Sequence, residues 1–232
     1  MITYQHYSFD LWFTLIKSNP TFKKERAKLF FEKYNSSKKT IEEVELIFRK
    51  VDLMCNGINE KTGCNIDAEE MYLMVMYLMN ENEDLFKQID LVNLYAAVEE
   101  ILMQNKPILF DENTFAVLQK LKSTQNCTMS LLSNTAFIKG SSLRKILDFY
   151  NLSHFFDFEI YSDEVGFSKP NEAIFTLMLQ KINELYPNKN IAINTIIHIG
   201  DNPVADIAGA EKLHLPTFQI NSNNHSIIDL IK

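Results

Sequence analysis

The sequence predicts an α/β protein, in which a doubly wound, Rossmann-like parallel sheet carries an all-helical domain inserted after its first strand. Five short apolar runs, bounded by polar or turn residues, predict strands buried on both faces; they are 7–9, 127–132, 158–161, 196–199 and 217–220. Helical patterns separate the later runs, and this alternation is typical of a parallel sheet. A long segment with almost no strand pattern separates the first run from the second.

The helices of the sheet region are expected at 112–122, 141–149, 171–185 and 204–213. The third places Ile174, Phe175, Met178 and Ile182 on one face, at the three- and four-residue steps of an amphipathic helix. Such a face predicts a helix that packs on the sheet.

The insertion covers roughly residues 17–106, and its helices are expected at 22–34, 41–54, 68–79 and 84–105. The second begins with a capping box formed by Thr40 and Glu43. Residues 56–63 carry the clearest turn pattern of the insertion, and this turn would either face a cleft or connect two helices in solvent. We expect residues 1–16 and 107–232 to form the catalytic core and 17–106 a helical cap domain.

Composition excludes several classes of function. The formal charge is −7 and no Lys/Arg-rich block is present, so neither nucleic acid nor an anionic membrane is an expected partner. Cys55, Cys64 and Cys127 are odd in number and lie in no paired spacing, which suits free thiols in a reducing compartment. No signal peptide and no apolar run of about 18 residues is found, so a cytoplasmic protein is expected. The oligomeric state is not predicted.

Polar residues follow four of the apolar runs, at the edge where open parallel sheets bind their ligands. Two carboxylates, a hydroxyl and an ammonium are therefore expected to converge there. In chain order, the residues are Asp10 and Thr14, Ser133 and Asn134, Lys169, and finally Asp201 and Asp206. A single Asp after a strand is more often a turn residue or a helix cap, but the whole set favours a functional site.

This set, in this order, resembles the haloacid dehalogenase-like superfamily of hydrolases, in the subgroup with a helical cap inserted after the first motif. The resemblance covers nearly the whole chain. The first motif of the family, Asp-x-Asp-x-Thr, is matched by Asp10 and Thr14 only. The second, third and fourth motifs are matched by Ser133, by Lys169, and by Asp201 with Asp206.

The resemblance implies an Mg²⁺-dependent phosphatase acting on a small phosphorylated metabolite. Asp10 would attack the phosphoryl group and form an aspartyl-phosphate, while Mg²⁺ would be held by Asp10, the main-chain carbonyl of Trp12 and Asp201. Ser133 would hydrogen-bond a phosphoryl oxygen and Lys169 would act as a point charge on nucleophile and phosphate.

The remaining residues of the motifs have supporting roles in this reading. Asp206 would position Lys169 or the water around the metal. Thr14 and Asn134 are expected near the substrate, although Asn134 is equally well explained as a turn residue or an indirect donor. His198, inside an apolar strand, is expected to be a core histidine whose hydrogen bonds are satisfied.

The first motif departs from the family at Trp12, where phosphatases carry the acid that protonates the leaving oxygen, and at Phe13, where a small residue is usual. General acid/base help is typically worth ~10²–10⁴ in rate, so a phosphatase with this motif would act poorly on unactivated esters. An aromatic residue at this place occurs in the metal-free haloacid dehalogenases, which lack the acidic pair after the fourth strand. A dehalogenase and a non-catalytic descendant that binds a phosphorylated ligand or a protein are therefore the alternatives.

Overall fold

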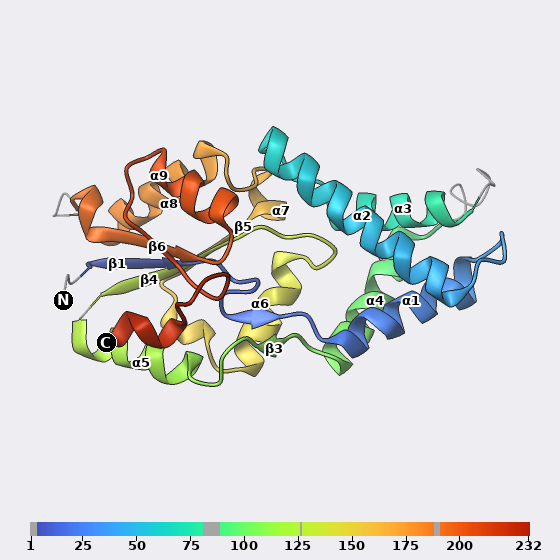
Figure 1. The fold of residues 1–232 in the computed structure, drawn as a ribbon, viewed down its shortest axis with the longest axis horizontal. Helices are drawn as coiled ribbons and strands as arrows, with labels where there is room; N and C mark the ends of the chain where they lie inside the picture. The colour runs from blue at the N-terminus through green and yellow to red at the C-terminus, as the bar shows by residue number, and fades with distance from the viewer. Residues whose placement is uncertain (1–3, 81–88, 126, 188–190) are drawn as a thin grey trace.

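A computed structural model describes residues 4–80, 89–125, 127–187 and 191–232. Its main sheet is five-stranded and wholly parallel, with the order β5-β4-β1-β6-β7 (Figure 1). The strands are β1 His6–Phe9, β4 Thr128–Ser133, β5 Phe158–Tyr161, β6 Ile196–Gly200 and β7 Thr217–Gln219. The prediction of a doubly wound parallel sheet is confirmed, and each of the five apolar runs forms one of its strands.

Helices cover both faces of this sheet (Figure 1). The helices of this region are α5 Thr114–Gln125, α6 Gly140–Phe149, α7 Ser162–Val165, α8 Glu172–Leu185 and α9 Gly209–Glu211, of which the four-residue α7 directly follows β5 at the carboxyl edge. Figure 1 shows α5 and α6 on one face and α8 and α9 on the other. The predicted apolar face of α8 is buried, and it packs in one cluster with Leu132, Ile160 and Ile196 of the sheet.

The continuous helix expected at 204–213 is wrong in detail. The chain first forms a π-helix over Pro203–Ala208, in which the Ile207 N–H donates to the Asn202 carbonyl five residues earlier. The short α9 follows. A π-turn is wider than an α-turn and is often found at functional sites, and a hydrophobic period alone does not distinguish the two.

The insertion forms four described helices, which lie beyond the carboxyl edge of the sheet (Figure 1). They are α1 Pro20–Tyr34, α2 Ile41–Thr62, α3 Ala68–Met79 and α4 Leu91–Gln104. The expected helix at 84–105 begins at Leu91 in the described chain, and its residues 84–88 lie outside the described residues. Two short antiparallel strands, β2 Ile16–Lys17 and β3 Ile108–Leu109, join where the chain leaves the sheet region and returns to it.

The turn expected at 56–63 is wrong, because α2 continues through Thr62 and ends only at Gly63. Gly63 has φ 71°, the left-handed conformation in which glycine commonly ends a helix. Gly57 and its asparagine neighbours are poor helix formers but are tolerated inside this helix.

The end of α2 is bonded to the loop that follows α7. The Gly63 carbonyl accepts hydrogen bonds from the Ser168 N–H and from Asn171 Nδ2, both at 3.0 Å. The Asn65 N–H donates to the Gly166 carbonyl at 3.1 Å. We call these three bonds the α2 strap; they join the insertion to the loop that carries Lys169.

None of the helices in the described part of the chain is both long and apolar enough to cross a membrane. The three cysteines are free thiols, of which Cys55 and Cys127 are buried and Cys64 is exposed.

Candidate active site

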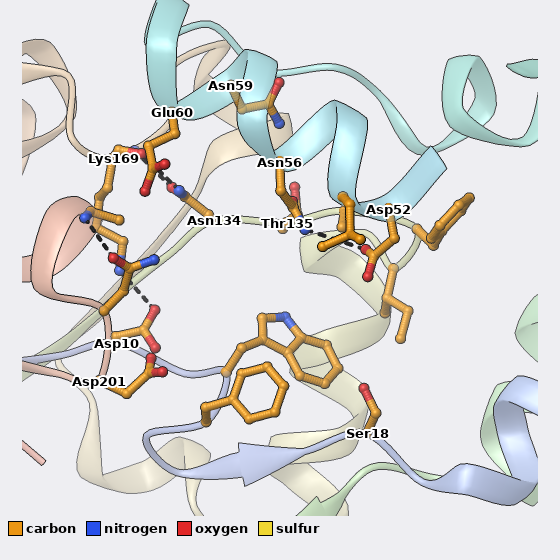
Figure 2. A pocket seen from close by; sticks show the side chains of 18 of the residues that line it. Asp10, Ser18, Asp52, Asn56, Asn59, Glu60, Asn134, Thr135, Lys169 and Asp201 are labelled. Carbon is orange, nitrogen blue, oxygen red and sulfur yellow. Dashed lines mark hydrogen bonds and ion pairs between the residues drawn. The ribbon is translucent and has the colours of Figure 1, made fainter. Parts of the chain in front are cut away.

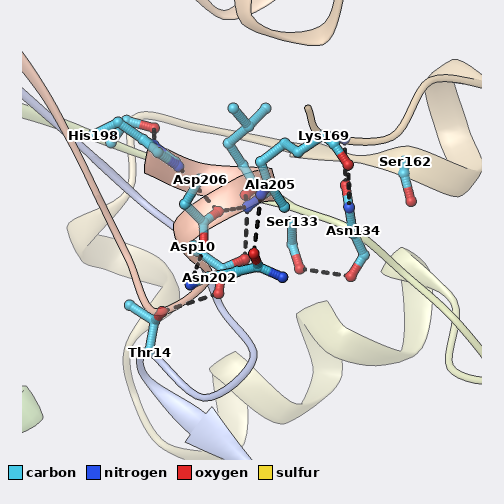
Figure 3. Close-up of polar contacts among 12 residues, drawn as sticks. Asp10, Thr14, Ser133, Asn134, Ser162, Lys169, His198, Asn202, Ala205 and Asp206 are labelled. Atoms are coloured by element: carbon cyan, nitrogen blue, oxygen red, sulfur yellow. Dashed lines mark hydrogen bonds and ion pairs between the residues drawn. The ribbon is translucent and has the colours of Figure 1, made fainter. Parts of the chain in front are cut away.

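Asp10 and Lys169 meet at the carboxyl edge of the sheet (Figure 3). Asp10 directly follows the central strand β1, and Lys169 lies on the loop after β5 and α7. The Lys169 Nζ donates to Asp10 Oδ1 at 2.7 Å, to Asp206 Oδ1 at 2.6 Å and to the Leu132 carbonyl at 2.6 Å. Its side chain is only 2% exposed, so this ammonium is stabilised by protein groups rather than by water.

Asp206 is held from several sides. Its Oδ2 accepts from the Asn202 N–H at 2.9 Å, and its Oδ1 lies 3.3 Å from His198 Nε2. His198 is fully buried and its other ring nitrogen lies 3.0 Å from Ser8 Oγ, so both ring nitrogens have partners. Gly200 is required here, because a Cβ at this position would lie 2.3 Å from Asp206 Cγ.

Negative charge exceeds positive charge at this site, and burial and the neighbouring charges shift the pKa values of its ionisable groups. Burial raises the pKa of Asp10 to about 7, Asp206 adds to the rise, and Lys169 opposes it. Burial and Asp206 raise the pKa of Asp201 to about 6. Burial also works against the ionised form of Asp206, yet Lys169 and His198 hold its pKa below its ordinary value. Burial would lower the pKa of Lys169, but the two carboxylates that contact it keep that pKa raised.

The donor set fits a hard divalent cation. Carboxylate oxygens of Asp10, Asp201 and Asp206 all lie within 4.8 Å of one another. Three carboxylates face one ammonium, which leaves a formal charge of −2 for a cation to balance. Asp206 has donors on both oxygens and His198 as a further neighbour, whereas each Asp10 oxygen has a single donor, from Lys169 or Thr14, so Asp201 and the remaining lone pairs of Asp10 are the groups that would hold a metal. Oxygen ligands of this kind are those that Mg²⁺ prefers.

Thr14, Ser133 and Asn134 lie beside this group (Figure 3). Thr14 Oγ1 donates to Asp10 Oδ2 at 3.0 Å, which leaves both carboxylate oxygens of Asp10 with a donor. Ser133 is fully buried and donates to the Asn134 carbonyl at 3.2 Å. The Asn134 side chain accepts from the Lys169 N–H at 2.7 Å and donates to the Lys169 carbonyl at 2.9 Å. Asn134 thus fixes the main chain at Lys169.

Trp12 and Phe13, which depart from the family motif, line the cavity next to Asp10. Phe13 has φ 58° and is 50% exposed, so a bulky side chain occupies a backbone conformation that disfavours it. Its N–H donates to the Ile16 carbonyl at 2.7 Å, and its carbonyl accepts from Asn221 at 2.8 Å. The turn is therefore held by hydrogen bonds at both ends of the residue.

The cavity above Asp10 measures about 500 Å³ and is closed on one side by the insertion (Figure 2). Helix α2 contributes Asn56, Gly57, Asn59 and Glu60, so the segment predicted as a turn does face the cleft, but as part of a helix. Other residues of the insertion that line the cavity were missed by sequence reasoning; they include Lys23, Arg26, Arg49 and Asp52. No motif spacing marks these residues, because only the packing of the insertion over the sheet brings them to the cavity.

Similar structures share this architecture. A magnesium-bound hydrolase from Bacillus subtilis, YfnB, has a TM-score of 0.68 at 18% identity, over 96% of this chain and 91% of that one. A phosphatase from Thermococcus onnurineus has a TM-score of 0.61 at 15% identity, over 97% of this chain and 95% of that one. A 2-haloacid dehalogenase from Pseudomonas syringae has a TM-score of 0.61 at 16% identity, over 97% of this chain and 89% of that one. At these identities the likeness shows the fold alone.

Sequence comparison gives the family. A hydrolase of Schizosaccharomyces pombe is 27% identical over 107 residues, which are 46% of this chain and 42% of that protein, so the match spans less than half of the relative. The sequence model of the haloacid dehalogenase-like hydrolases matches residues 4–214, nearly the whole chain. The strands, the order of the four motifs and this match agree, and the chain belongs to the haloacid dehalogenase-like hydrolases.

Proposed function

We propose that this hydrolase is an Mg²⁺-dependent phosphatase of a small phosphorylated metabolite. The observation that carries the proposal is the excess of carboxylate over ammonium around Asp10, Asp201 and Asp206. A site that displaces halide without a metal gains nothing from that added negative charge, whereas a divalent cation balances it. Mg²⁺, held by Asp10, Asp201 and the Trp12 carbonyl, would spread the charge of the phosphoryl group.

The proposed reaction has two steps, the transfer of the phosphoryl group to Asp10 and the hydrolysis of the aspartyl-phosphate. An Asp10 oxygen attacks phosphorus in line, the ester P–O bond breaks, and the leaving oxygen takes a proton from water. Water then attacks the phosphorus of the aspartyl-phosphate, which releases inorganic phosphate and restores the carboxylate. Lys169 favours the ionised form of Asp10, and Thr14 donates to its second oxygen. Ser133 turns its hydroxyl from the Asn134 carbonyl to a phosphoryl oxygen.

Residues 17–106 act as the cap in this proposal. Helices α1 and α2 line the cavity opposite Asp10, so a bound metabolite lies between the insertion and the sheet. Closing such a cavity excludes bulk water and strengthens the electrostatic interactions inside it. The size of the cavity favours a small molecule, and the net charge of −7 disfavours a polyanionic partner.

The first test is metal dependence. We expect hydrolysis of aryl and acyl phosphates with Mg²⁺ and none in EDTA. We also expect Asp201→Asn to raise the Mg²⁺ concentration for half-maximal rate by at least the ~10–100-fold typical of outer-shell changes. Asp148→Asn is the matched control, because Asp148 is an exposed residue of α6 outside the cavity. Turnover that is indifferent to metal would overturn the proposal.

Trp12 gives a second test, because it occupies the place of the general acid. We expect Trp12→Asp to raise kcat toward unactivated alkyl phosphates by about 10², the lower end of the range for general acid/base catalysis. Trp12→Asn is the control, since it makes the same loss of aromatic packing without supplying a proton. Equal rates for the two variants would show that the cavity does not hold the leaving oxygen near residue 12.

Trp12 also favours one other function, a 2-haloacid dehalogenase. In that reaction Asp10 would attack carbon, halide would leave, and water would hydrolyse the resulting ester. Release of halide from 2-haloacids in EDTA, lost in Asp10→Asn, would establish this function in place of the phosphatase. We expect no halide release.

A further inference from the structure

Arg26 of α1 is a buried cation at the wall of the cavity. It is 6% exposed, and its Nε–H has no hydrogen-bond partner in the part of the chain that the structure describes. Among residues 4–80, 89–125, 127–187 and 191–232, no carboxylate lies within ion-pair distance of its guanidinium. A buried charge with no counter-ion is costly, so a folded protein that keeps one commonly gains from it when a ligand is bound.

Three aromatic rings position this guanidinium. Its Cζ lies 4.2 Å from the ring centroid of Phe48, 4.4 Å from that of Phe137 and 5.2 Å from that of Phe22. Contacts of this kind each contribute about 0.5–2 kcal/mol, and they fix the plane of the group. They offer no acceptor to the Nε–H, and Arg26 is one of the residues that line the cavity.

The charge of the surrounding wall also favours an anion. Lys23, Arg26 and Arg49 line the insertion side of the cavity together with Asp52 and Glu60. Asp52 is already paired with Arg49 at 3.3 Å. The cations Lys23 and Arg26 therefore face one uncommitted carboxylate on this side of the cavity.

The loop after β4 links this cation to the reaction centre. Asn134 at its start is hydrogen-bonded to the main chain of Lys169, and Phe137 stacks on Arg26. Arg26, Asp10 and Lys169 all line the same cavity of about 500 Å³, so one ligand can lie between the two sites. A small molecule with a carbon skeleton of a few atoms can reach both.

We infer that Arg26 binds a second anionic group of the substrate, so that the enzyme selects metabolites with a phosphoryl ester at one end and a carboxylate or second phosphate at the other. This inference rests on the proposed phosphatase function. A planar guanidinium binds either anion through two parallel hydrogen bonds, and both anions are therefore tested.

The experiment compares matched esters. We expect wild-type protein with Mg²⁺ to prefer 6-phosphogluconate over glucose 6-phosphate, or fructose 1,6-bisphosphate over fructose 6-phosphate, by about 10–100-fold in kcat/KM, chiefly through KM. In Arg26→Met this ratio falls to about one, and Arg26→Lys keeps an intermediate ratio. Lys28→Met, an exposed cation on the same helix, keeps the wild-type ratio. An unchanged ratio in Arg26→Met would overturn the inference.

Two further measurements separate this inference from the proposed function and from a purely structural role. In Asp10→Asn, which cannot turn over, we expect the ligand of each pair that carries two anionic groups to raise Tm more than the ligand that carries one, and the difference to vanish when Arg26→Met is added. This binding assay does not depend on turnover. If the wild-type protein with Mg²⁺ does not hydrolyse the aryl phosphate p-nitrophenyl phosphate, that result refutes the proposed phosphatase function but not the binding of a second anionic group by Arg26. Without ligand, Arg26→Met should change Tm little, because the ring contacts that are lost are offset by removal of a buried charge without a counter-ion; a lowered Tm together with an unchanged ligand effect would mean that Arg26 only supports the fold.

Discussion

Asp10→Asn is expected to lose turnover of phosphate esters by on the order of 10⁶, the loss typical when the nucleophile of a covalent mechanism is removed. An amide is not a nucleophile toward phosphorus, and it also withdraws one anionic metal ligand. The fold should survive, because the variant replaces a carboxylate whose ionised form is disfavoured by burial and by two neighbouring carboxylates. In EDTA we expect Tm to rise, since one negative charge of the excess is gone.

Rates and Tm measured on the same preparation separate chemistry from folding. Asp148→Asn on the surface of α6 should change neither. Residual turnover within tenfold of wild type would show that Asp10 is not the nucleophile. A large fall in Tm in EDTA would show that its ion pair with Lys169 stabilises the fold more than its burial costs.

Lys169→Met is expected to lower the free energy of unfolding by about 3–5 kcal/mol, the range for removing one partner of a buried ion pair. Two buried carboxylates, Asp10 and Asp206, lose their shared cation, and the Leu132 carbonyl loses a donor. Turnover should fall as well, by roughly 10²–10³, because a preorganised donor at the reacting group is lost. Urea denaturation and steady-state kinetics measure the two effects.

A double-mutant cycle gives the sharper result. Adding Asp10→Asn to Lys169→Met removes one of the orphaned charges, so in EDTA we expect Asp10→Asn to stabilise Lys169→Met by more than it stabilises the wild type. If the two changes in stability simply add, Lys169 and Asp10 do not interact in solution as they do in the structure. The exposed Lys28→Met serves again as the control for loss of a cation.

The strands could be predicted because each is an apolar run that ends at a polar residue, and the parallel order then placed Asp10, Lys169 and Asp206 at one edge. Strands β2 and β3 are two residues each, too short for any periodic pattern, and were missed. The turn at 56–63 was inferred from local composition, which the packing of α2 overrides.

The cation at Arg26 could not be predicted, because its role depends on two surfaces that are far apart in the sequence. Its ring partners Phe48 and Phe137 come from α2 and from the loop after β4. Motif spacing reports on residues at strand ends, where topology fixes the position. It carries no information about how a helical insertion is oriented above them, so the residues of the insertion that line the cavity appear only in the folded structure.

The α2 strap joins the C-terminal end of helix α2 to the loop that carries Lys169. The Gly63 carbonyl accepts a hydrogen bond from the Ser168 N–H, and Lys169 is the next residue in the chain. A side chain at Gly63 would meet Asn171, the other member of the strap, at 2.7 Å. A substitution at the end of α2 would therefore reach the loop that carries Lys169 without touching substrate, so we expect residues 63 and 171 to change together among relatives in which this insertion has evolved toward a new substrate.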